Sequence, residues 1–134
     1  MGMSERPILA TIESTRTGPL DTVTVVLAYR DQTHAGTASA SVGADIGNSL
    51  KLVAEAAASA IEAQVAGEWN LEVRAVALAE VGDQTVCLVQ VADLDAGDQL
   101  FGVAGVGNDD IEKAMARAVL DATNRRMAPK LDND

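Results

Sequence analysis

The sequence predicts an α+β fold of pseudo-duplicated βββα units, in which an antiparallel sheet carries two helices on one face. Three observations predict this fold. Several segments alternate apolar and polar residues and are rich in β-branched side chains, as half-buried strands are. Two longer segments carry apolar residues at helical spacing. A near-repeat relates the first half of the chain to the second.

The near-repeat is carried by Thr37–Gly43 (TASASVG) and Phe101–Gly107 (FGVAGVG), each of which leads into a helical pattern. Ala40, Val42 and Gly43 align with Ala104, Val106 and Gly107. Beyond a short gap, both helical patterns share apolar residues at i, i+4, i+7, i+8 and i+11. These residues are Leu50, Ala54, Ala57, Ala58 and Ile61 in the first pattern, and Ile111, Met115, Ala118, Val119 and Ala122 in the second. Chance similarity between small residues is the competing explanation.

The first half contains three candidate strands. Ile8–Ser14 alternates weakly, and the element order becomes ββα-βββα if this segment is not a strand. Thr22–Arg30 alternates clearly and is dominated by β-branched side chains. Asp31–His34 would turn the chain back into Ala35–Val42, whose small side chains suit a strand that lies close under a helix.

The second half repeats the plan. It predicts a strand over Leu71–Val81, a tight hairpin turn at Gly82-Asp83 and a strand over Thr85–Asp93. A loop through Asp95–Asp98 then leads to a third antiparallel strand, Leu100–Gly107.

Capping residues predict the helix ends. Asp45 or Asn48 would cap the first helix and Gly67 would end it. Asn108 is the expected N-cap of the second helix, whose first turn is acidic and whose last turn holds Arg125 and Arg126. We expect one domain over residues 1–134, with a core of about 7–127 and a frayed polar tail at 128–134.

Strands of the second half are apolar on both faces, which one layer of helices cannot cover. A second copy of the chain is the expected cover, so the sequence predicts a homodimer through the uncovered sheet face. The opposing sets are Leu71, Val73, Ala75, Ala77 and Ala79 against Val76 and Leu78, and Cys87, Val89 and Val91 against Val86 and Leu88.

Composition restricts the partners. Ten Lys and Arg against twenty Asp and Glu give a net charge of −10, which repels nucleic acid and anionic membranes. The strand and helix order over Ser49–Met127 imitates a double-stranded-RNA-binding domain, but Asp109 and Asp110 stand where that domain needs basic residues. A lone cysteine, the absence of an apolar run of about 20 residues and the absence of a signal peptide favour the cytoplasm.

No residue pattern predicts a reaction, a resident metal or a cofactor. With His34 as the single histidine and Cys87 as the single thiol, the usual triads and multi-ligand zinc sites cannot be assembled. We expect His34 to be a solvated turn residue and Cys87 to be a buried thiol on a strand. The acidic stretch Asp93–Asp98 has a metal-like spacing, but it does not fit an EF-hand loop and is expected to be a solvated hairpin loop.

The glycine-rich turn before the second helix is the candidate ligand site. Exposed backbone N–H groups at a helix start can hold a carboxylate, and neighbouring acids can hold an ammonium group. Close packing of helix and sheet is the alternative explanation for the glycines. The candidate residues are Gly105, Gly107, Asn108, Asp109 and Asp110.

The stretch FGVAGVGNDDIEKAMARAVLDATNRRM resembles the end of the C-terminal regulatory domain of 2-isopropylmalate synthases. The resemblance covers about 27 residues and implies a duplicated βββα domain that dimerises and binds leucine. The catalytic barrel has no counterpart here, and the first half cannot be matched residue by residue. The residues that carry the likeness are Gly105, Val106, Gly107, Ala114, Ala118, Val119, Ala122, Asn124 and Arg125.

We therefore expect a non-catalytic, homodimeric small-molecule-binding or regulatory module that takes an amino-acid-like ligand. The alternative is a protein-interaction adaptor that recruits a different protein through its apolar sheet face. RNA binding and an unrecognised enzyme are weaker alternatives.

Overall fold

The structure is a computed structural model that describes residues 7–41, 46–65, 69–108 and 110–132. These residues follow the order βββαβββα, which confirms the α+β fold, its duplicated organisation and the first strand. The strands form two antiparallel sheets of three strands each, and each sheet keeps the sequence order. The elements are β1 (Ile8–Thr17), β2 (Leu20–Tyr29), β3 (Gln32–Ala40), α1 (Ile46–Gln64), β4 (Leu71–Val81), β5 (Gln84–Asp93), β6 (Asp98–Gly105) and α2 (Ile111–Asp132).

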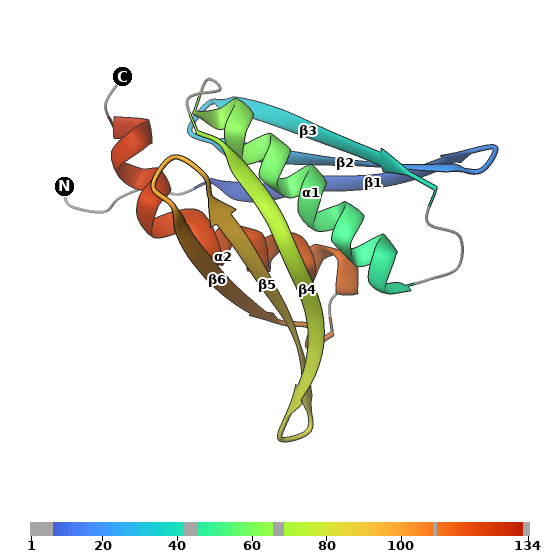
Figure 1. Cartoon of the computed structure of the whole chain (residues 1–134). Coiled ribbons are helices and arrows are strands. Elements are labelled where there is room, and N and C mark those ends of the chain that lie inside the picture. The colour runs from blue at the N-terminus through green and yellow to red at the C-terminus, as the bar shows by residue number, and fades with distance from the viewer. Residues whose placement is uncertain (1–6, 42–45, 66–68, 109, 133–134) are drawn as a thin grey trace.

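The helices lie between the two sheets (Figure 1). Helix α1 packs on β2 and β3 and also contacts β4, while α2 packs on β5 and β6 and also contacts β1. The helices contact each other as well. Each sheet therefore has an inner face, covered by a helix, and an outer face that no described element covers.

Two glycines fix the distance between each sheet and its helix. A Cβ on Gly36 of β3 would overlap the backbone of Ala56 and Ala60 in α1. A Cβ on Gly102 of β6 would overlap the backbone of Ala118 and Ala122 in α2. Both strands therefore touch helix backbone directly, which requires glycine on the strand and alanine on the helix.

The equivalence of Gly36 and Gly102 also fixes the alignment of the two halves. The β2–β3 turn holds two residues, Arg30 and Asp31, whereas the β5–β6 loop holds Leu94–Gly97. Gly36 therefore aligns with Gly102, so that Ala38, and not Ala40, matches Ala104. The sequence alignment paired Ala40 with Ala104 because it did not take the longer β5–β6 loop into account.

Further features recur at equivalent positions of the two units. Gly18 and Gly82 sit in the β1–β2 and β4–β5 turns with φ of +62° and +63°. The strand register slips between Leu9 and Thr11 in β1 and, equivalently, between Val73 and Ala75 in β4. A shared bulge and a shared turn conformation are local details that a chance similarity of small residues would not reproduce.

The helices repeat the same burial pattern. Exposed Lys51 and Glu55 in α1 match exposed Lys113 and Arg117 in α2, with buried triplets between and after them. Ala56 therefore matches Ala118, one position away from the alignment that the apolar stripes predict. Alanine-rich helices make the stripe ambiguous by one residue, because small apolar side chains occupy several adjacent positions.

The helix starts differ from the expected ones. Helix α1 already includes Asn48, which is therefore not its cap, while Asp45 and Gly67 lie outside the described residues. Asp110, and not Asn108, caps α2, since its Oδ1 accepts a hydrogen bond of 2.9 Å from the Glu112 amide. Helix α2 continues through Asp132, so most of the segment 128–134 is helical.

The bulge in β4 changes which residues share a face. Val73 lies opposite Val91 on the inner face together with Val76 and Leu78, not with Ala75 as strict alternation predicts. The inner face of this sheet also holds Cys87 and Val89 and is covered by α2.

The edge strand β6 is protected at Val103. The Val103 amide donates a hydrogen bond of 3.0 Å to Asp121 Oδ2 on α2. A side chain of the adjacent helix thus accepts the hydrogen bond of a backbone N–H group that could otherwise pair with another strand.

Neither α1 nor α2, the helices of the described segments, combines the length and apolar content that crossing a bilayer requires.

The requirement for glycine at position 102 can be tested by substitution. We expect Gly102→Ala to lower the free energy of unfolding by about 3 kcal/mol or more, because the helix backbone must move away from β6. Gly105→Ala is the matched control on the same strand, where an added Cβ meets nothing within 4 Å. Chemical denaturation should show a change below about 1 kcal/mol for this control. Equal effects of both substitutions would contradict the close packing.

Candidate functional site

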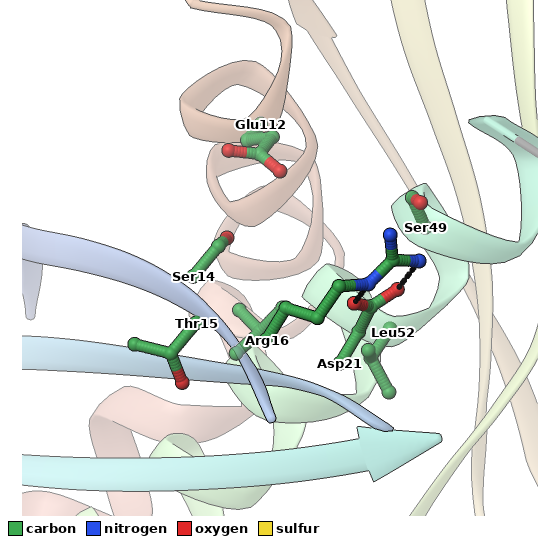
Figure 2. A pocket seen from close by; sticks show the side chains of 8 residues that line it. Ser14, Thr15, Arg16, Asp21, Ser49, Leu52 and Glu112 are labelled. Atoms are coloured by element: carbon green, nitrogen blue, oxygen red, sulfur yellow. Dashed lines mark hydrogen bonds and ion pairs between the residues drawn. The ribbon is translucent and has the colours of Figure 1, made fainter. Parts of the chain in front are cut away.

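A cleft of about 360 Å³ opens where the two βββα units meet. Ser14, Thr15 and Arg16 come from the end of β1, and Asp21 and Val23 come from the start of β2. The starts of both helices close the cleft, through Ser49 and Leu52 of α1 and Glu112 of α2 (Figure 2). Among the lining residues of the described segments, Glu112 is the one from the second unit.

Arg16 and Asp21 form an ion pair across the β1–β2 hairpin. Arg16 Nε donates to Asp21 Oδ1 at 2.8 Å, and Nη2 lies 3.5 Å from Oδ2. The Arg16 side chain is 58% exposed and that of Asp21 is 21% exposed. The exposed arginine makes this pair a modest contribution to stability. More than half of the Arg16 side chain is exposed at the open side of the cleft.

Glu112 supplies a second carboxylate in the first turn of α2. Burial raises its pKa above the ordinary range, and the charge of Asp110 raises it further, while a hydrogen bond with Ser14 acts in the opposite direction. Ser14 points toward Glu112 in Figure 2. The charged form of a partly buried carboxylate with a raised pKa is stabilised when a cation binds beside it.

The duplication allows a direct comparison with the same region of the second unit. Glu112 matches Leu50, Ser14 matches Leu78 and Ser49 matches Ile111. The Arg16–Asp21 pair matches Glu80 and Thr85, whose side chains are hydrogen-bonded at 2.8 Å. Three polar lining residues of the cleft thus have aliphatic counterparts, so the polarity of this cleft is not a requirement of the fold.

The predicted glycine-rich site lies beside this cleft without lining it. Gly105 ends β6, Gly107 adopts φ of +55° and Asn108 is an exposed turn residue. Asp109 lies outside the described residues. Asp110 uses one carboxylate oxygen to cap α2 and also interacts with Glu112 of the cleft. The alternative explanation, close packing, applies to Gly102 but not to Gly105, which faces open space.

The cleft combines the groups that bind a small zwitterion. Arg16 and the amino-terminal turns of two helices favour a carboxylate, and Asp21 and Glu112 favour an ammonium group. Leu52 and Val23 offer an apolar wall. The volume lies at the small end of the range of ligand pockets.

Sequence reasoning did not identify Arg16, Asp21 or Glu112. Arg16 and Asp21 lie in a hairpin whose polar residues look like ordinary turn residues, and Glu112 looked like a helix-dipole residue. The near-repeat contained a usable signal, because Glu112 stands where the first unit has Leu50. This signal can be used only after the two units have been aligned by their strand–helix contacts.

The acidic loop is held by protein partners. Arg126 Nη1 donates to Asp93 Oδ2 at 3.0 Å and Nη2 donates to Asp98 Oδ2 at 2.6 Å. Asp95 accepts hydrogen bonds of 2.8 and 3.0 Å from the backbone and side-chain amides of Asn70. In the described segments, no group of three or more His, Cys, Asp or Glu side chains is arranged to hold a metal ion.

His34 and Cys87 both lie on strands. His34 is a half-buried residue of β3 opposite Leu27, not a turn residue, because Arg30 at φ of +57° and Asp31 already make the turn. Cys87 is buried as expected; its Sγ lies 3.8 Å from the Ile111 carbonyl oxygen, and burial raises the pKa of the thiol.

Comparison with protein-family models, with curated proteins and with solved structures gives no match to this chain.

The Asp93 cluster predicts a defined response to acid. Burial alone would favour protonated Asp93, but hydrogen bonds from the Ala96 amide, the Trp69 side chain and Arg126 outweigh burial and lower its pKa. A lowered pKa in the folded state contributes stability above the unfolded value of about 3.9, and this contribution is lost as the pH falls through the folded pKa.

We therefore expect Asp93→Asn to lower the melting temperature at pH 7 by several degrees, with the difference from the parent shrinking as the pH falls from about 5 toward 2. Asp83→Asn, at the exposed β4–β5 turn, is the control and should follow the parent throughout. A constant difference between Asp93→Asn and the parent across this range would contradict the assignment.

Proposed function

We propose that this chain is a non-catalytic, homodimeric module of the cytoplasm that binds a small amino-acid-like molecule and reports its presence to a partner. The proposal assigns the ligand to the cleft at Arg16, Asp21 and Glu112. The resemblance to the leucine-sensing domain of 2-isopropylmalate synthases agrees with this assignment in layout and in ligand class.

The observation that carries the proposal is the polarity of the cleft against its counterpart. Two units with the same strands, bulges and turns differ where Ser14, Ser49 and Glu112 replace Leu78, Ile111 and Leu50. A purely structural contact between units would be stabilised by the aliphatic residues. Placing an accessible guanidinium and a partly buried carboxylate there instead supports a ligand of mixed charge.

The binding mode follows from the charges. The ligand carboxylate meets Arg16, its ammonium group meets Glu112 and Asp21, and its side chain lies along Leu52. Because the pKa of Glu112 is raised, acidification protonates this ammonium partner earlier than an ordinary glutamate. Affinity then falls as the pH drops through the raised pKa of Glu112, and binding in that range releases a proton.

A second candidate function is a protein-interaction adaptor. The observation that favours it is the apolar outer face of β4–β6, where Phe101 is 70% exposed and Val103 is 49% exposed. An adaptor of this kind recruits a different protein and has no requirement for a ligand in the cleft.

Thermal melting with a panel of amino acids, 2-keto acids and 2-hydroxy acids at millimolar concentration tests the ligand. A ligand present at about 100 times its dissociation constant stabilises the fold by about 2.7 kcal/mol, which raises the melting temperature by several degrees. We expect at least one zwitterion to do so, and Arg16→Gln and Glu112→Gln to abolish the shift.

Glu80→Gln is the matched control, because Glu80 occupies the position of Arg16 in the second unit and pairs with Thr85. It should keep the full ligand response. A panel without any shift, or an Arg16→Gln variant that responds as the parent does, would remove the cleft as a ligand site.

A further inference from the structure

The outer faces of the two sheets differ although the units are duplicated. On the first sheet, hydroxyl side chains dominate, and two cross-strand pairs are hydrogen-bonded: Thr22 with Ser39 at 2.9 Å and Thr24 with Thr37 at 3.2 Å. On the second sheet, the equivalent positions are almost entirely apolar. The fold therefore does not require an apolar outer face.

We name these two surfaces the first and second outer faces. The first outer face consists of Thr11, Glu13, Thr15, Thr17, Leu20, Thr22, Thr24, Val26, Ala35, Thr37 and Ser39. The second outer face consists, in the same order, of Ala75, Ala77, Ala79, Val81, Gln84, Val86, Leu88, Gln90, Phe101, Val103 and Gly105.

We propose that the second outer face is the homodimer interface and that Phe101 of each copy enters a groove on the second outer face of the other. This inference rests on the homodimer of the proposed function and assigns the surface that forms it. The groove has a volume of about 260 Å³, and its lining includes Ala75, Ala77 and Leu88 with Phe101 at its edge. Its lining residues other than Gln90 have no polar side chain, so water in the groove gains few hydrogen bonds.

Charge selects a second copy as the occupant. At one end, beyond the residues named above, the second outer face also carries Glu72 and Arg74, which pair with each other at 3.1 Å. The face, which lies within the described segment 69–108, therefore has no net charge, whereas the chain has a net charge of −10. Two identical acidic molecules repel each other least through a face without net charge. A different partner attracted by this chain's charge would be basic, and the one acidic side chain of this face is already paired with Arg74.

The size of the face places the contact at the small end of specific interfaces. Strands of 11, 10 and 8 residues cover about 30 Å by 14 Å, or roughly 400 Å² in projection, and protruding side chains such as Phe101 add accessible area. A standard interface buries about 800 Å² per partner. The apolar centre is bordered by Gln84 and by Gln90, which is hydrogen-bonded to Gln99 at 2.9 Å. An apolar centre with a polar rim is the usual composition of such a contact.

A two-fold axis through the face limits the assembly to two copies, because each copy uses the same surface. Each copy presents both a groove and an exposed ring, so one rotation satisfies both copies. Facing sheets pack about 10 Å apart, a separation that side chains of this size can fill. The ligand cleft lies on inner residues of one chain and remains complete in a monomer.

Sedimentation equilibrium of the full chain, from about 1 to 100 µM, tests the interface. We expect a dimer for the parent and at least a 100-fold weaker dimer for Phe101→Asp. The matched control is Ala35→Asp, at the equivalent exposed position of the first outer face, with an expected change below about 3-fold. Phe101→Ser is the milder second variant, and circular dichroism of each variant checks that the fold is retained.

A parent that is monomeric at 100 µM overturns the inference, as does a dimer that Phe101→Asp leaves intact or that Ala35→Asp weakens equally. A monomer that assembles only with a different protein also overturns it and favours the adaptor. The ligand response of folded Phe101→Asp is measured separately. Loss of the dimer with a retained melting shift supports both proposals, and a dimer without any ligand response contradicts the cleft alone.

Discussion

Direct contact between strand and helix backbones is the constraint on which the rest of the structure depends. Gly36 and Gly102 leave no room for a side chain, so each sheet rests on the backbone of its alanine-rich helix. This contact sets the layer spacing, the alignment of the two units and the residues that can face the core. It also explains a buried core that contains many alanines and a single tryptophan, Trp69. Close approach replaces large side chains as the means of filling space.

Sequence patterns were sufficient for the elements but not for their exact alignment. Thr22–Arg30 and Leu71–Val81 were recognised because β-branched and apolar residues alternate over a long segment. The bulge at Arg74 was not recognisable, since a single extra residue changes the face of Val73 without any unusual residue type. We predicted Asn108 instead of Asp110 as the N-cap of α2, because Asn108, Asp109 and Asp110 are all residue types that cap helices well.

The residues of the candidate cleft could not be predicted from the sequence. Asp110 of the predicted site lies at the end of α2 that borders the cleft, but the cleft depends on Arg16 and Asp21, which are distant in sequence and resemble ordinary hairpin residues. Their significance emerges from comparison with Glu80 and Thr85 at the same place in the other unit. A duplicated chain thus contains its own reference, because a position at which the two units differ is not fixed by the fold. Reading it requires the spatial alignment first.

The hydrogen bond from Val103 to Asp121 bears on how large an assembly can become. An unprotected edge strand can add another strand, and the added copy presents a new edge, so growth by this route has no end and leads to filaments. With a carboxylate seated on the amide of β6, lateral addition costs a hydrogen bond and places a desolvated charge in the way. Association through a face, by contrast, is complete after two copies. The carboxylate of Asp121 therefore acts against the addition of a strand at the β6 edge.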